Sequence, residues 1–187
     1  YSHPISFLAF GISGGAFAML TATSWNDVIW SFIMSLVVYL FVYWASISKG
    51  VSKMLEPLVS LVSAFCVAGL MHYDPHINKS LVVLSSIIAF IPGLALTLGL
   101  RELAARDLMS GTARIMDAIM LLFKLYFGAV LGFAIGKMVW GDAEFVQPEQ
   151  VQTWTAWIAV LLLGSSLVVM FKIRLKDSPW GILSGFI

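Results

Sequence analysis

Charged residues and cysteine are scarce in this sequence. Only 11% of its 187 residues are Asp, Glu, Lys or Arg, against roughly 25% in soluble domains. The single cysteine, Cys66, stands in an apolar stretch, so an intrachain disulfide is excluded. The formal net charge is +1, without the concentrated basic patch that binding to nucleic acid requires. We therefore expect neither redox chemistry nor a nucleic-acid partner.

Apolar residues fill the sequence instead, and they make up 60% of it. A soluble fold has no means of burying so much apolar surface. The residues fall into blocks about as long as the ~20 residues that a helix needs to cross a hydrocarbon core, where each helix satisfies its own backbone hydrogen bonds. The sequence therefore predicts an all-α fold, a polytopic transmembrane helical bundle in contact with the lipid bilayer.

Six full spans and the beginning of a seventh are expected. Asn26 and Asp27 are predicted to cap the second span, because short polar side chains satisfy the free amides at a helix start. Pro57 suits the first turn of the third, where its missing N–H has no partner to lose. The expected spans are Ile5–Ala22, Val28–Trp44, Pro57–Met71, Leu81–Leu100, Ile115–Val139, Val151–Phe171 and Trp180–Ile187.

The basic residues indicate how these spans are oriented. If the amino terminus lies inside, the cytoplasmic segments hold eight Lys and Arg residues and the outer segments hold two, Lys79 and Lys137. Cytoplasmic loops retain the excess of positive charge, so we expect the amino terminus of this segment inside. The chain begins with Tyr1 and becomes apolar almost at once, without the pattern of a signal peptide. We therefore interpret it as a fragment of a longer protein.

Two segments of the sequence share a pattern of residue spacing. The spacing of Gly14, Asp27 and Trp30 in the first hairpin recurs at Gly164, Asp177 and Trp180. An odd number of spans separates the two copies, which inverts the second relative to the first. Inverted repeats are common in secondary transporters. We predict that residues 1–145 form a first five-span half and that 146–187 begin a second, inverted half.

The fifth span carries charges on one helical face. Arg114, Asp117, Leu121, Lys124 and Gly128 recur at spacings of three, four and seven residues. A charge at membrane depth costs about 2.5 to 3.5 kcal/mol on insertion scales, so it normally faces a partner or water. One interpretation places Asp117 and Lys124 as neighbours in the bundle interior, with Lys124 or Arg114 attracting a substrate carboxylate and Asp117 carrying a proton or the substrate amine. The alternative is an Arg114–Asp117 ion pair at the interface while Lys124 snorkels.

Glycines recur at four-residue spacing in two spans. Gly11 and Gly15 lie in the first, and Gly128, Gly132 and Gly136 lie in the fifth. Small residues at this spacing let helix backbones approach closely in lipid. We expect these glycines to pack helices together, or to form an interface that moves during alternating access.

Pro92 and Gly93 interrupt the fourth span near its middle. Proline removes a backbone hydrogen bond and glycine permits unusual torsions, so the pair is expected to break the helix and present backbone groups to a ligand. A simple kink without ligand contact is the other interpretation.

Two motifs known from enzymes carry little weight here. Residues 11–15 match G-x-S-x-G, but that motif requires a strand, a turn and a helix, which an apolar span does not supply. His72, Asp74 and His76 are more typical of a polar loop than of a metal site, because Pro75 breaks the helical spacing. We expect no metal, no cofactor and no enzymatic activity.

The run from Ile91 to Arg114, IPGLALTLGLRELAARDLMSGTAR, resembles the signature region of the bacterial threonine/serine exporter family, ThrE. The matching positions are Pro92, Gly93, Asp107, Gly111, Ala113 and Arg114. The flanking runs SWNDVIWSFIMSL and FKIRLKDSPWGIL resemble the starts of the two membrane halves of the family. The likeness covers nearly the whole chain.

This resemblance implies a ten-span protein of two inverted halves, fused or encoded as two subunits, in the bacterial cytoplasmic membrane. Members are described as proton-driven exporters of threonine and serine, and a two-subunit branch is associated with succinate. The implied partners are a second transmembrane half and a small-molecule substrate, and a homo-oligomer is compatible with the pattern. The residues we expect along the substrate or proton path are Pro92, Gly93, Asp107, Arg114, Asp117 and Lys124.

Three functional hypotheses follow. The first is a proton-coupled exporter of small hydroxylated amino acids. The second keeps transport but changes the substrate to a dicarboxylate, for which two positive groups make chemical sense. The third is a non-transporting membrane scaffold subunit in which the glycines serve assembly alone.

Overall fold

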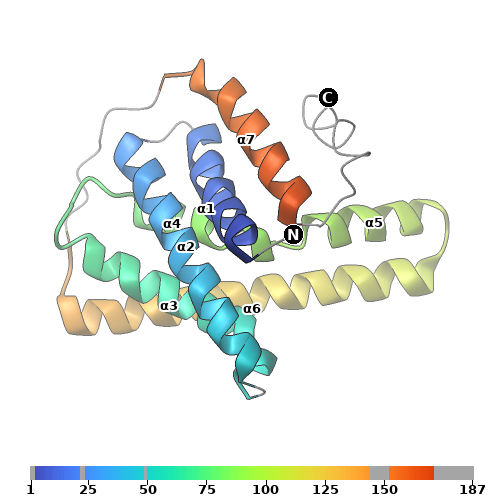
Figure 1. The fold of residues 1–187 in the computed structure, drawn as a ribbon. Coiled ribbons are helices and arrows are strands. Elements are labelled where there is room, and N and C mark those ends of the chain that lie inside the picture. Colours follow the sequence, from blue (N-terminus) through green and yellow to red (C-terminus); the bar gives the residue numbers. More distant parts are fainter. Residues whose placement is uncertain (1–2, 22–23, 49, 144–151, 171–187) are drawn as a thin grey trace.

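The computed structural model describes residues 3–21, 24–48, 50–143 and 152–170 (Figure 1). Every regular element within these residues is a helix, which confirms the predicted all-helical class. The elements are α1 (His3–Leu20), α2 (Trp25–Ile47), the 3₁₀ turn η1 (Val51–Met54), α3 (Leu55–Leu70), α4 (Lys79–Ser86), the 3₁₀ turn η2 (Ile88–Phe90), α5 (Gly93–Ala104), α6 (Leu108–Trp140) and α7 (Thr155–Met170).

Not all of these helices are long enough to cross a bilayer. α2 and α6 meet the requirements of length and hydropathy, and α4 with α5 makes a third candidate if the bent pair is one span. α1, α3 and α7 are apolar but shorter. The 16 residues of α3 rise only about 24 Å, less than the ~30 Å hydrocarbon core. Six full spans and the inverted repeat therefore stay predictions, and Trp180–Ile187 lies outside the described residues.

Helix α6 is the element on which two others lie (Figure 1). α3 runs parallel to its second half, since Ser60, Ala64 and Ala68 of α3 face successive glycines of α6. α5 runs antiparallel to its first half and extends away from α1, α2 and α7 (Figure 1). α1 packs against α2, α4 and α7. The buried core therefore lies among α1 to α4 and the second half of α6.

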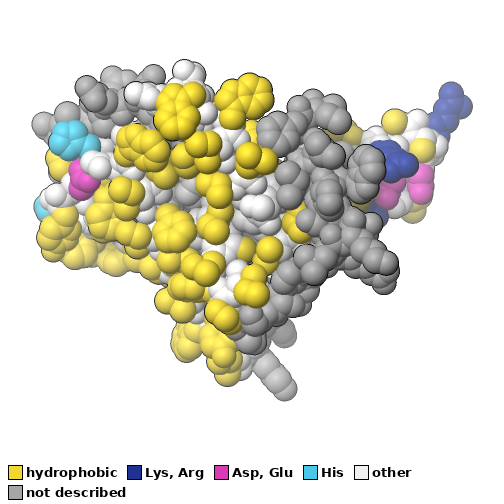
Figure 2. All heavy atoms as spheres, turned by 45° about the horizontal axis from the view of Figure 1, so that its top comes forward, with side chains coloured by type: hydrophobic (Ala, Val, Ile, Leu, Met, Phe, Trp, Pro, Cys, Tyr) yellow, Lys and Arg dark blue, Asp and Glu magenta, His cyan; other side chains and the backbone are white. Residues whose placement is uncertain are grey.

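The surface carries the pattern expected of a protein in a bilayer. Apolar side chains cover much of the described surface seen in Figure 2, while charged and His side chains lie toward its two ends. Many large apolar side chains are exposed, including Ile47 at the end of α2 and Phe123, Tyr126 and Met138 on α6. Lipid is as apolar as these side chains, so their exposure costs nothing there.

The beginning of α2 differs from the prediction. Asn26 and Asp27 were expected to cap the helix, but this is wrong: Ser24 is the N-cap, and its hydroxyl accepts the Asp27 N–H at 3.2 Å. Asp27 occupies the third helical position and turns its carboxylate inward. There its Oδ1 accepts the N–H of Asn78 at 2.8 Å, which ties the start of α2 to the start of α4.

The fourth predicted span is broken, as the proline and glycine suggested. α4 ends at Ser86, and the axis bends by 54° before α5. Pro92 has no N–H to continue the helix, and Ile91 before it is extended (φ −69°, ψ 123°), as a residue before proline prefers. The break thus begins at Ile87, five residues ahead of the proline.

The glycines of α6 set how closely α3 approaches. A Cβ on Gly128 would overlap the Ser60 hydroxyl, and one on Gly132 would overlap the Leu61 carbonyl and lie 2.7 Å from Ala64 Cβ. Gly11 plays the same part in α1, where a Cβ would lie 2.6 Å from the Leu36 side chain of α2. Backbone contact of this kind replaces the hydrophobic effect as the force between helices in lipid.

We predict that Gly132→Leu destabilises the protein by about 1 to 3 kcal/mol, because the new side chain forces α3 and α6 apart. The measurement is thermal unfolding in detergent, followed by loss of the monodisperse peak in size-exclusion chromatography. Gly50→Ala is the matched control, since nothing lies within 4 Å of a Cβ there. Equal midpoints for the two variants would contradict the close approach of the helices.

Candidate functional site

Arg114 pairs with Glu102 of α5. The guanidinium makes two contacts with that carboxylate, Nη2 to Oε1 at 2.9 Å and Nε donating to Oε2 at 3.2 Å. The hydroxyl of Ser110 also donates to Glu102 Oε2, at 2.8 Å. A planar guanidinium matches a carboxylate well in this two-point geometry. The alternative pairing of Arg114 with Asp117 is therefore wrong, because the antiparallel α5 brings Glu102 closer.

Asp107 has a structural part in the turn between α5 and α6. It is the N-cap of α6, where its carboxylate accepts the Ser110 N–H at 3.3 Å. Its own N–H bonds to the Glu102 carbonyl, and the N–H of Arg106 bonds to the Leu103 carbonyl. This is a Schellman ending of α5, with Arg106 at φ 63° in the position that glycine usually takes.

Asp117 and Lys124 are exposed on α6, so the prediction that they lie in the interior is wrong for the described bundle. The buried face of α6 belongs to Ala118, Leu125 and the glycines at 111, 128, 132 and 136. Close packing on α3 and α5 selects these small side chains, and the longer charged ones lie to one side. The structure brings neither of them into an ion pair among the described residues.

The length of α6 places these two residues at different depths. Its 33 residues rise about 50 Å, well beyond a ~30 Å hydrocarbon core. From Asp117 to Lys137 the rise is about 30 Å. If Lys137 lies at one headgroup level, Asp117 reaches the other, and Lys124 lies inside the core. Lys124 is then a charged side chain at membrane depth, where a charge is costly unless it meets water or a polar partner.

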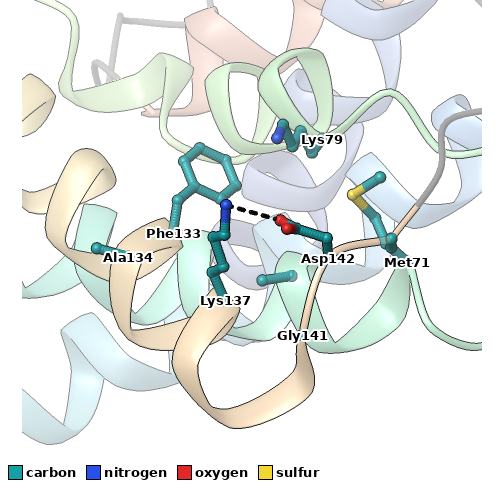
Figure 3. Close-up of a pocket in the computed structure, with 9 residues that line it drawn as sticks. Met71, Lys79, Phe133, Ala134, Lys137, Gly141 and Asp142 are labelled. Carbon is teal, nitrogen blue, oxygen red and sulfur yellow. Dashed lines mark ion pairs between the residues drawn. The ribbon is translucent and has the colours of Figure 1, made fainter.

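A mixed-charge pocket lies where α3 ends and α4 begins, beside the end of α6 (Figure 3). Its volume is about 230 Å³. Lys137 and Asp142 form an ion pair at 3.0 Å, and Lys79 Nζ lies 5.6 Å from the centre of the Phe133 ring. Lys79 has no carboxylate partner among the described residues. The pocket therefore holds one balanced pair of charges and one further ammonium group.

A larger, apolar hollow of about 530 Å³ lies between α4 and α6. Ile87 and Ile91 of the helix break line it on one side and Leu125 and Ala129 on the other. Phe133 lines both hollows, so the mixed-charge pocket adjoins a groove that leads to the break. Pro92 is half-buried at this break and Gly93 is exposed, with nothing within 4 Å of a Cβ built on it.

The polar segment between α3 and α4 is held by Asp74. Its Oδ2 accepts from Asn26 Nδ2 at 3.2 Å and from the Trp30 indole at 3.4 Å, and its Oδ1 accepts the His76 N–H at 3.1 Å. His76 Nδ1 also lies 3.4 Å from Asp74. In the part of the chain that the structure describes, no group of three or more His, Cys, Asp or Glu side chains is placed to hold a metal ion.

Sequence reasoning missed the polar groups that the fold does bury. Asp27 and the serines at 13, 31, 35, 60, 63, 85 and 86 are all at most 1% exposed. A signal was present, since Asp27, Ser31 and Ser35 recur every four residues within an apolar helix. Serine is easily overlooked in a span because its hydroxyl bonds locally to the helix backbone.

The model of the family ThrE, described as "Putative threonine/serine exporter", matches residues 1–136. Among curated proteins, the chain is similar to Pheromone-regulated membrane protein 10 of Eremothecium gossypii, with 31% identity over 63% of this chain and 16% of that protein. The protein of the same name from Saccharomyces cerevisiae (strain S288c) is 26% identical over 68% of this chain and 34% of its own length. No solved structure matches.

The chain thus spans well under two thirds of either relative. Its apolar helices and these relatives establish a membrane protein.

The Glu102–Arg114 pair gives a test of whether these two side chains stabilise the turn between α5 and α6. The side chains are 26% and 41% exposed, so breaking the pair with Arg114→Ala should lower the midpoint of thermal unfolding only slightly. The exchanged variant Glu102→Arg with Arg114→Glu should recover the midpoint of the parent protein. An exchanged variant no more stable than Arg114→Ala would contradict a structural role of the pair.

Proposed function

The chain belongs to the threonine/serine exporter family, and on that premise we propose that it is the transport-competent membrane part of a proton-driven exporter of threonine and serine. The observation that carries this proposal is the family match over residues 1–136. Further parts of the proposal are a bacterial cytoplasmic membrane, an amino terminus of this segment inside, and a second transmembrane half that completes the transporter.

The mixed-charge pocket supports an amino acid as the substrate. Its volume of about 230 Å³ is below the ~300 to 1,000 Å³ of sites for drug-sized ligands, which suits a smaller solute. Lys79 offers an ammonium group for the substrate carboxylate. Asp142, paired with Lys137 at 3.0 Å, offers an acceptor for the substrate amine. A zwitterion thus finds both signs of charge in one hollow.

A dicarboxylate is the second candidate because the pocket contains two lysines. Asp142, which lies 3.0 Å from Lys137, would repel the second carboxylate of a dianion, whereas it attracts the amine of a zwitterion. The charge balance of the pocket therefore favours the amino acid.

The broken helix supports alternating access. Broken helices place backbone groups near the midplane of many secondary transporters, where substrate and coupling ions bind. Here the break from Ile87 to Pro92 adjoins the groove that leads from the mixed-charge pocket. We propose that the substrate moves along this groove as the bundle changes conformation.

Lys124 belongs to the same proposal. A lysine at membrane depth faces water or a polar partner rather than acyl chains. Lys124 is exposed on α6 and lies one turn before Gly128, which contacts α3. We propose that it faces a water-filled path, with Asp117 at the mouth of that path and Arg114 and Asp107 holding the turn beside it.

We predict that the purified protein in proteoliposomes exchanges external radiolabelled threonine for internal threonine and that an imposed pH gradient drives net transport. Lys79→Gln should raise the KM for threonine by about tenfold, the equivalent of ~1.4 kcal/mol, because the carboxylate loses its ammonium partner. Arg101→Gln is the matched control, an exposed cation on α5 away from the pocket. Exchange of succinate without exchange of threonine would replace the proposed substrate, and absence of both would favour a scaffold.

We also predict that a cysteine at position 124 reacts with a small membrane-impermeant thiol reagent in a variant whose native Cys66 is replaced by Ala. Phe123→Cys is the matched control, because Phe123 is the adjacent exposed apolar residue and should face lipid. Labelling of position 124 alone indicates a water-filled path. Equal labelling at both positions, or labelling at neither, would contradict it.

A further inference from the structure

Helix α2 turns a stripe of polar side chains toward the interior of the bundle. Asp27, Ser31 and Ser35 are four residues apart and share one face. Their exposed fractions are 1%, 0% and 1%, while Ile29 and Leu40 on other faces are 55% and 56% exposed. A carboxylic acid buried in the interior of a membrane bundle indicates a functional site, since burying an ionisable side chain at membrane depth costs free energy.

Three hydroxyl groups around this stripe have no hydrogen-bond partner among the described residues. They are Ser31 Oγ and Ser35 Oγ of α2 and Ser85 Oγ of α4. A Cβ on Gly14 of α1 would overlap the Ser35 hydroxyl and lie 3.0 Å from the Ser85 carbonyl oxygen, so groups from three helices meet there. A buried hydroxyl without a partner destabilises the fold. Ordered water normally satisfies such groups.

Helix α4 ends where these hydroxyls meet. Its last residue is Ser86, whose hydroxyl lies 3.2 Å from the Ser63 hydroxyl of α3. The carboxyl end of a helix carries partial negative charge, and the break that begins at Ile87 leaves this end inside the bundle. Broken helices of secondary transporters use such ends to hold coupling ions.

Asp27 lies at the entrance to this polar interior. Its Oδ1 accepts the Asn78 N–H at 2.8 Å, beside the polar segment between α3 and α4. The Asp74 carboxylate lies beside the same end of α2, where it accepts from Asn26 and Trp30. The titratable groups on the described segments that pack against α2 are His72, Tyr73, Asp74 and His76 of the connecting segment, Lys79 of α4, and Glu56 and Cys66 of α3.

We propose that Asp27 and the hydroxyls of Ser31, Ser35 and Ser85 form the path of the coupling proton, from the polar segment between α3 and α4 to the helix break. The Asp27 carboxylate takes a proton from a hydronium ion at that segment, which leaves a water molecule, and becomes a neutral acid. It then passes this proton to water between the hydroxyls, and each hydroxyl gives up one proton as it accepts another, so that a hydronium ion forms in the water at the helix break. The carboxylate is restored and the serines are unchanged. This path rests on the proposed transport function.

Asp27→Asn is the decisive variant because it keeps an oxygen to accept the Asn78 N–H but cannot take up and release a proton. In proteoliposomes, transport of threonine driven by a pH gradient should be lost, while threonine counterflow, which needs no net proton movement, should stay near the parent level. Asp27→Glu should restore part of the coupled transport. Full pH-driven transport by Asp27→Asn would overturn the proton path. Absence of counterflow in the parent protein would overturn the proposed substrate instead.

A second measurement tests Asp27 without any substrate. A pH-jump infrared difference spectrum of the protein in liposomes should contain C=O bands of protonated carboxylic acids, and one component of these bands should be lost in Asp27→Asn. Bands unchanged by the substitution would show that Asp27 does not titrate and would overturn the proposal, whatever the transport assays show.

The serines give an independent arm if Asp27→Asn fails to fold. Ser35→Ala combined with Ser85→Ala removes two hydroxyls from the proposed path, and pH-driven transport should fall several-fold with counterflow retained. Ser46→Ala is the matched control on α2, since Ser46 is exposed and bonds to the Tyr43 carbonyl of its own helix. Equal coupled rates for the double variant and the control would contradict the path.

Discussion

A helix in hydrocarbon must direct its polar side chains away from the lipid, and this requirement governs the arrangement of the whole bundle. α2 meets it by burying Asp27, Ser31 and Ser35 while Ile29 and Leu40 face outward. α6 meets it differently: its buried face consists largely of glycine and alanine, so that the backbones of α3 and α5 come close. Apolar surface and polar interior are two results of one solvent constraint.

The break between α4 and α5 connects the features that bear on transport. It ends a short helix among buried serines, it lines the apolar groove on α6, and through that groove it adjoins the mixed-charge pocket. The Asn78–Asp27 hydrogen bond fixes the other end of α4 to α2. In the proposed exporter, a displacement of α4 would therefore reach the carboxylate at one end and the break at the other, and this would link proton binding to the movement of substrate.

Much of this fold was readable from the sequence, because long apolar runs and prolines act locally. The runs predicted α2 and most of α6, although α6 begins at Leu108 rather than Ile115, and Pro92 with Gly93 predicted the break. The ion-pair partner of Arg114 could not be predicted from the sequence. Glu102 lies on another helix, and the turn at Arg106, which makes α5 and α6 antiparallel, brings the two side chains together. Helical spacing likewise placed Asp117 and Lys124 on a common face of α6. The spacing within α6 did not predict which face of α6 packs against α3, because that depends on the small residues of both helices.

The contact between α3 and α6 repeats itself along both helices. Ser60, Ala64 and Ala68 meet Gly128, Gly132 and Gly136 in order, each pair one turn beyond the last. If α3 slid by one turn, Ser60 would meet Gly132 and Ala64 would meet Gly136, so two of the three matches would survive. The even spacing means that a shift of four residues, about 6 Å along the axis, would keep two of the three small-residue contacts, so this interface is better suited to sliding than one built from large interlocking side chains.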